Sequence, residues 1–124
     1  DYGHWSAHRL ERLTDGDLKH GEAVAIGLGI DAALAVELGR ATPDFQRRVL
    51  SVLHNFGFKL DHAQLDDPGT LFVGIEQFRA HLGGSLTLTL VAEPGVPFDI
   101  HDADLTLIAG AIERHRSMVR TLLA

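Results

Sequence analysis

Residues 21–38 read GEAVAIGLGIDAALAVEL, and this stretch decides the fold. Apolar side chains occupy nearly every side of a helix formed by it, whereas a helix at a protein surface carries them on one face. We therefore predict a buried helix in the middle of a bundle, ending at Gly39, a residue that readily terminates helices. The run is too short to cross a bilayer. Gly27 and Gly29 are expected to let another backbone approach closely.

Further elements are predicted from caps, apolar spacing and turn residues. They are helices over residues 2–13, from Pro43 to about 55–57, over 70–82 and from Asp102 or Asp104 to about Leu123, and strands over 85–92 and 98–101. Thr42 is a favourable N-cap, and proline is favoured in the first helical position. Residues 66–69 are expected to form a loop. The fold class is mainly α with one small β-hairpin, in a single domain over residues 1–124.

Apolar positions at helical spacing give the predicted core. Its members are Phe45, Val49, Leu50, Leu53, Leu105, Ile108, Ile112 and Val119, with Phe56, Phe58 and Phe72 as further candidates. Four histidines outside any motif, His54, His62, His101 and His115, are expected at the surface or in loops. The segment 114–116 is interpreted as a solvated cationic face of the last helix.

Composition narrows the functional classes. The 17 acidic and 11 basic residues give a net charge of -6. The sequence shows no cluster of basic residues of the kind that binds nucleic acid, so we expect no nucleic-acid partner. The absence of cysteine excludes a disulfide scaffold and a thiolate zinc finger, so the reducing cytoplasm is the expected location. We find no signal peptide and expect no membrane partner. Because the chain opens at Asp1 without a methionine, we expect it to be a piece of a longer protein.

Three histidines near the start of the chain are spaced for metal binding. His4 and His8 are four residues apart on one predicted helix, and His20 follows twelve residues after His8. Side chains four apart are neighbours on a helix surface, so the first two imidazoles can chelate one ion. A catalytic zinc ion takes three protein ligands and keeps one position open. The alternative interpretation of the same spacing is that His4 and His8 are surface histidines without a function.

The residues around these histidines form two linked motifs. Residues 3–11 read GHWSAHRLE, and residues 19–27 read KHGEAVAIG. They resemble the signature of the dehydroquinate synthase superfamily of sugar phosphate cyclases, which is Gly-His-x-x-Gly-His-x-x-Glu followed by His-Gly-Glu-Ala-Val at the start of the next helix. All three histidines are in register. Trp5 and Ala7 depart from the family's usual Thr and Gly. The resemblance implies the helical C-terminal domain of that fold.

The resemblance also implies roles for individual residues. His4 and His20 match the two family histidines that bind the catalytic zinc. His8 matches a third histidine, which faces the substrate and is suited to hydrogen bonding or proton transfer there. Asp1 matches a substrate-contacting position that is Asn in dehydroquinate synthases.

Family members take a seven-carbon sugar phosphate through oxidation on one bound NAD, elimination of phosphate, return of the hydride, ring opening and aldol closure to a carbocycle. The metal, zinc or cobalt, polarises a substrate oxygen, and NAD carries the redox step. The family's third zinc ligand, a Glu, and its NAD-binding domain are absent from this chain. We therefore expect an enzyme domain that is inactive alone, that pairs with its own N-terminal NAD-binding domain and that forms a homodimer.

Two departures bear on the substrate. Asp1 replaces Asn, and residues 76–81 read EQFRAH where dehydroquinate synthases carry an Asp-Lys-Lys segment. A Lys there would help to bind the substrate carboxylate. The pattern resembles cyclases of sedoheptulose 7-phosphate, such as 2-epi-5-epi-valiolone synthase, with His81 as a substrate contact. It favours that substrate over 3-deoxy-arabino-heptulosonate 7-phosphate, the substrate of 3-dehydroquinate synthase. The alternative from another class is a non-catalytic helical module that binds a metal or a partner.

Overall fold

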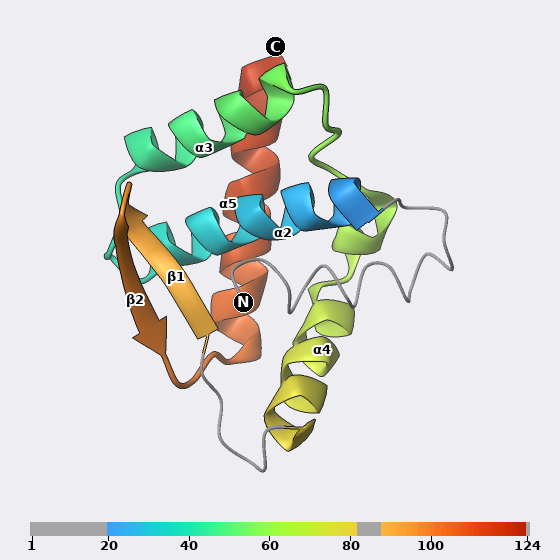
Figure 1. Cartoon of the computed structure of the whole chain (residues 1–124). Coiled ribbons are helices and arrows are strands. Elements are labelled where there is room, and N and C mark those ends of the chain that lie inside the picture. The colour runs from blue at the N-terminus through green and yellow to red at the C-terminus, as the bar shows by residue number, and fades with distance from the viewer. Residues whose placement is uncertain (1–19, 82–87, 124) are drawn as a thin grey trace.

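Helix α2 (His20–Glu37) is the central element of the fold. The computed structural model describes residues 20–81 and 88–123. Eleven of the 18 residues of α2 are buried, which confirms the predicted central helix. Helix α5 (Leu105–Leu123) crosses α2 and makes the most extensive helix contact with it (Figure 1). In the described part of the chain, no helix is long and apolar enough to span a membrane.

Helix α3 (Pro43–Asn55) follows α2 after a tight turn. The turn contains Gly39 at a φ of 72°, a left-handed conformation that glycine adopts without strain. The Thr42 hydroxyl accepts a hydrogen bond from the Phe45 amide at 3.1 Å, so the predicted N-cap is confirmed. Helix α3 packs against α2 and α5.

The segment after α3 differs from the prediction. Residues Ala63–Asp66 form a single 3-10 turn, η1, and helix α4 (Pro68–His81) begins two residues earlier than expected. The start is stabilised by Asp67, whose carboxylate accepts from the Gly69 amide at 3.0 Å and whose carbonyl accepts from the Thr70 hydroxyl at 2.9 Å. Pro68 therefore lies in the first helical turn and not in a loop. Proline fits there because the backbone N–H that it lacks would have no partner within the helix.

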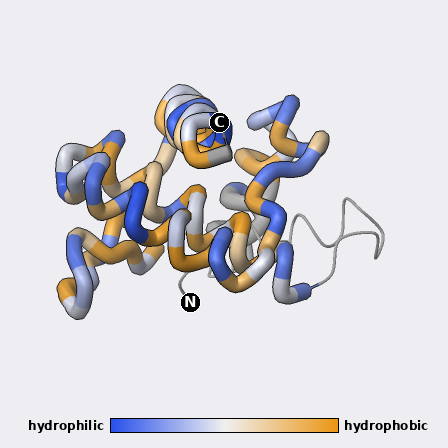
Figure 2. The backbone as a smooth tube through the Cα atoms, turned by 90° about the horizontal axis from the view of Figure 1, so that it is seen from above, coloured by the Kyte–Doolittle hydropathy of each residue, from blue (hydrophilic) through white to orange (hydrophobic). Residues whose placement is uncertain are grey.

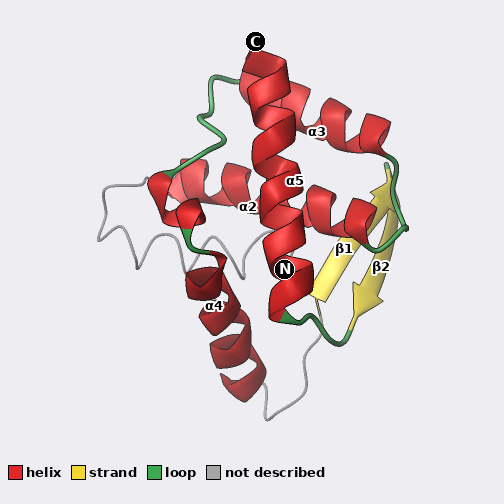
Figure 3. Cartoon of the chain, turned by 180° about the vertical axis from the view of Figure 1, so that it is seen from behind, coloured by secondary structure: helices red, strands yellow, loops and turns green. Residues whose placement is uncertain are grey.

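A two-stranded antiparallel hairpin completes the fold. Strands β1 (Leu88–Glu93) and β2 (Val96–Ile100) pair with Leu90 opposite Phe98, and Gly95 occupies the turn at a φ of 78°. Strand β1 packs on α2. Seen from behind, the hairpin and α4 lie on opposite sides of the crossed helices (Figure 3). The predicted hairpin is thus confirmed over the residues described.

Two apolar clusters form the core, one shared by α2, α4, β1 and α5 and a smaller one between α2, α3 and α5. Seen from above, α5 is viewed nearly end-on below the C-terminus and carries both hydrophobic and hydrophilic residues (Figure 2). Leu50, Ile108, Ile112 and Val119 are buried as predicted. Phe56 and Leu105 were expected in the core, but Phe56 is 78% exposed and Leu105 is 45% exposed. Both lie at helix ends, since Phe56 is the C-cap of α3 and Leu105 is the first residue of α5.

Asp104 rather than Asp102 caps α5, because its carboxylate accepts from the Leu107 amide at 2.8 Å. The predicted helix over residues 2–13 lies outside the described residues, as do residues 85–87 of the first predicted strand.

Candidate functional site

His20 is the first residue of α2, and it is exposed. A helix start carries unpaired backbone N–H groups and a partial positive charge, which favours acidic neighbours such as Glu22 in the first turn. In the described part of the chain, no group of three or more His, Asp or Glu side chains is arranged to hold a metal ion. Of the two predicted metal ligands, His4 and His20, the described part of the chain contains His20.

Of the other predicted site residues, His81 alone lies in the described part of the chain. Asp1, His4 and His8 lie outside the described residues. His81 is the last residue of α4. The turn η1 lies beside the start of α2, and α4 leads away from it (Figures 1 and 3). Helix α4 has 14 residues and is therefore about 21 Å long. The role of His81 as a substrate contact stays a prediction.

Residues 58–66, which we call the 58–66 segment, run past the start of α2. The ring of Phe58 lies 3.5 Å from where a Cβ on Gly21 would be, next to His20. The segment is held locally by two short contacts, in which the His62 amide donates to Asp61 at 2.8 Å and the Gln64 amide donates to His62 Nδ1 at 3.1 Å. It has no ladder of backbone hydrogen bonds beyond η1, so its place depends on tertiary contacts.

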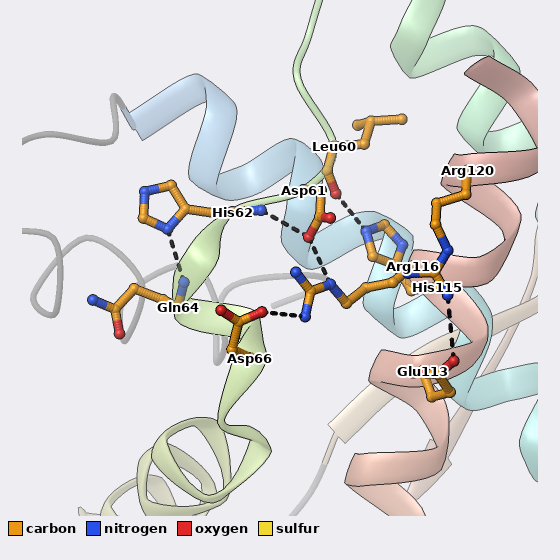
Figure 4. Close-up of polar contacts among 9 residues, drawn as sticks. All are labelled: Leu60, Asp61, His62, Gln64, Asp66, Glu113, His115, Arg116 and Arg120. Atoms are coloured by element: carbon orange, nitrogen blue, oxygen red, sulfur yellow. Dashed lines mark hydrogen bonds and ion pairs between the residues drawn. The ribbon is translucent and has the colours of Figure 1, made fainter. Parts of the chain in front are cut away.

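Arg116 of α5 provides two of these tertiary contacts (Figure 4). Its Nε donates to Asp61 at 2.9 Å, and its Nη1 donates to Asp66 at 2.7 Å. The Arg116 side chain is only 19% exposed. The pKa of Arg116 is raised, chiefly by the hydrogen bond to Asp66, so the guanidinium stays charged. One cation thereby joins Asp61, two residues before η1, and Asp66, the last residue of η1, to helix α5.

His115 provides the third contact and corrects the prediction that it lies on a solvated face. Its side chain is completely buried, and Nε2 donates to the Leu60 carbonyl at 2.6 Å. Nδ1 has no hydrogen-bond partner, although the Gly29 backbone lies close to it. The pKa of His115 is lowered, mainly because burial disfavours the charged ring. Gly29 thus accommodates a side chain rather than a second backbone.

A sequence signal for this buried histidine existed. Ile108, Ile112, His115 and Val119 are spaced by four, three and four residues, which is one face of a helix. The arginines on either side, Arg114 and Arg116, instead favoured the interpretation of a solvated cationic face. Arg114 pairs with Glu37 at 2.7 Å at the other end of α2.

Known proteins resemble this chain over most of its length. The 3-dehydroquinate synthase of Corynebacterium jeikeium (strain K411) is 27% identical over 113 residues, which cover 90% of this chain and 30% of the relative. The 2-epi-valiolone synthase of Actinosynnema mirum is 28% identical over 123 residues, which cover 94% and 31%. The chain therefore spans about a third of the length of these relatives.

A solved structure shares the fold. ValA, the 2-epi-5-epi-valiolone synthase from Streptomyces hygroscopicus subsp. jinggangensis 5008 with NAD+ and Zn2+ bound, superposes with a TM-score of 0.87 at 24% identity. The match covers 94% of this chain and 32% of that one. It confirms the expected fold class, mainly α with one hairpin in a dehydroquinate synthase-like arrangement.

The sequence model of the family described as 3-dehydroquinate synthase C-terminal matches residues 1–73, more than half of the chain and the part that holds both histidine motifs. The chain belongs to this family of sugar phosphate cyclases.

Proposed function

We propose that the chain is the metal- and substrate-binding C-terminal domain of an NAD- and zinc-dependent sugar phosphate cyclase. The observation that carries this proposal is the family match over residues 1–73, which include Asp1, His4, His8 and His20. The cyclase would eliminate phosphate from a seven-carbon sugar phosphate and close a carbocycle. An N-terminal NAD-binding domain would complete it, and the assembly would be a cytoplasmic homodimer.

His20 fits a zinc ligand by its chemistry and its place. Its imidazole is a nitrogen donor of the kind zinc prefers, and it is exposed at the start of a rigid, buried helix. The remaining ligands would be His4 and a glutamate of the N-terminal domain. When bound, the ion would act as a Lewis acid on a substrate oxygen. His8 would donate or accept a proton at the reacting end, and Asp1 and His81 would bind substrate hydroxyls.

The favoured substrate is sedoheptulose 7-phosphate. Asp1 in place of Asn and His81 in a segment without the family's lysines support this choice, as does the similarity to 2-epi-valiolone synthase across 94% of the chain. The second candidate is 3-dehydroquinate synthase, acting on 3-deoxy-arabino-heptulosonate 7-phosphate. The similarity of this chain to the 3-dehydroquinate synthase of Corynebacterium jeikeium supports this second candidate.

The test uses the full-length protein, loaded with zinc or cobalt and NAD. Each sugar phosphate is supplied separately, and phosphate release and the carbocyclic product are followed. Turnover of sedoheptulose 7-phosphate alone would support the first candidate, and turnover of the other substrate alone would support the second.

Substitutions separate the metal site from the substrate question. His4→Ala and His20→Ala should each abolish zinc binding and turnover, because each removes a ligand. His54→Ala is the matched control, since His54 is an exposed histidine of α3 outside both motifs. Zinc bound as tightly by His20→Ala as by the wild type would refute the assigned metal ligand, and so would equal losses in His54→Ala.

A further inference from the structure

The three arginines of α5 form ion pairs of unequal burial. Arg120 meets Glu113 at 3.4 Å, and both side chains are mostly exposed. Such surface pairs contribute little to stability. Arg116 differs, because its less exposed guanidinium binds two carboxylates at short distance, in residues 55 and 50 positions away. The contact joins α5 to the 58–66 segment and not to another helix.

The 58–66 segment connects this ion pair to the start of α2. At one end, the Phe58 ring lies 3.5 Å from where a Cβ on Gly21, the residue after His20, would be. At the other end, Asp66 closes η1. Between them, Arg116 binds Asp61 while His115 binds the Leu60 carbonyl (Figure 4). These polar contacts at residues 60, 61 and 66, together with the buried side chains of Leu60 and Leu65, fix a stretch that is not itself part of a sheet or a long helix.

We propose that Arg116 is a positioning residue for the metal-binding end of α2. Its two ion pairs hold the 58–66 segment against Gly21 and thereby set the direction from which His20 reaches the metal. The inference rests on the proposed function of His20. Residues that orient a metal ligand from outside its coordination shell commonly change metal affinity by about 10- to 100-fold when they are removed. Because Arg116 acts through a segment, we expect a loss of about tenfold, the lower end of that range.

The experiment compares two arginines of the same helix in the full-length protein. Arg116→Met removes the pairs with Asp61 and Asp66, and Arg114→Met removes the pair with Glu37, the last residue of α2. Zinc affinity is measured by competition with a chromophoric chelator, and the visible absorption of bound cobalt reports ligand geometry. Melting temperature is recorded for each variant.

Arg116→Met should weaken zinc binding about tenfold and alter the cobalt spectrum, and Arg116→Lys should recover part of the affinity. Arg114→Met should leave both readouts at the wild-type value, even where it lowers the melting temperature. Equal effects of the two methionine variants would reduce Arg116 to a stabilising role and overturn the proposal. Unchanged zinc affinity in Arg116→Met would overturn it as well.

A milder variant covers a failure of Arg116→Met to fold. Asp66→Asn removes the charge of the partner that is 71% exposed and should weaken zinc binding in the same direction. No change in that variant would refute the proposal. Zinc binding by the wild type, lost in His20→Ala, is the separate check on the proposed function. If that check fails, the metal site itself is wrong; if it holds and the arginine variants do not differ, only the role of Arg116 is wrong.

Discussion

Replacing Gly29 with alanine should destabilise the chain, although alanine is the better helix former. A Cβ on Gly29 would lie 2.7 Å from His115 Nδ1 and 2.9 Å from Leu50 Cδ2. Neither neighbour can turn out of the way into solvent. The His115 ring is completely buried and bonded to the Leu60 carbonyl at 2.6 Å, and Leu50 is completely buried in the second core cluster.

Two opposing terms set the magnitude. The change from glycine to alanine inside a helix gains about 1 kcal/mol in helix propensity. Overpacking a filled core costs about 1–3 kcal/mol, and contacts below 3 Å to two fixed groups place Gly29 at the upper end. We therefore expect a net loss of about 2 kcal/mol in the free energy of unfolding.

Gly110 of α5 is the matched control. The nearest atoms to a Cβ there belong to the Glu37 carboxyl group, at 3.6 Å, which is an ordinary contact. Gly110→Ala should therefore gain up to about 1 kcal/mol. Urea unfolding of the purified chain, followed by circular dichroism, should shift the midpoint down for Gly29→Ala and up for Gly110→Ala. Equal upward shifts would refute the proposed clash.

A double-mutant cycle locates the cause. In a His115→Ala background the ring is gone, so Gly29→Ala should cost less than in the wild type. Additive effects of the two changes would mean that His115 does not oppose the new methyl group.

Three further predictions concern single residues. Thr42→Ala removes the N-cap of α3 and should lower the free energy of unfolding by about 1 kcal/mol in urea titrations. Unfolded His115 takes up a proton as the pH falls through about 6.5, whereas the buried ring, whose pKa is lowered, takes one up only at lower pH, so the free energy of unfolding should decrease as the pH falls below about 6.5, by at most about 1.4 kcal/mol per pH unit. His115→Gln should remove that component when unfolding is measured on both sides of pH 6.5. Phe56→Ser, at a residue 78% exposed, should reduce self-association in light scattering and leave the unfolding midpoint unchanged.

Local chemistry made most of the helices predictable. Thr42 and Pro43 start α3, and Gly39 ends α2, because caps and turns depend on residues within a few positions of one another. The same reasoning treated Pro68 as part of a loop. Proline fits both a turn and a first helical position, and the choice is made by the carboxylate and carbonyl of Asp67.

The candidate site was predictable only where a motif identifies residues by their spacing. The spacing of the histidine motifs identified His20 as a candidate ligand. Helix α2, which begins at His20, was predictable from the apolar residues that follow His20. The contacts of Arg116 have no such signal, because its partners lie 55 and 50 residues away and no periodicity links them.

His115 shows how two correct local observations can lead to the wrong environment. A histidine between two arginines is typical of a solvated face when the three are considered as neighbours in sequence. Successive residues on a helix, however, point about 100° apart, so Arg114 reaches Glu37 at the end of α2 and Arg116 reaches Asp61 and Asp66, while His115 faces the core between them. The absence of a side chain at Gly29 is what makes room for the ring. A small residue on one buried helix and an unexplained polar residue in the apolar stripe of another are therefore best interpreted together, since each is unfavourable alone and the pair is not.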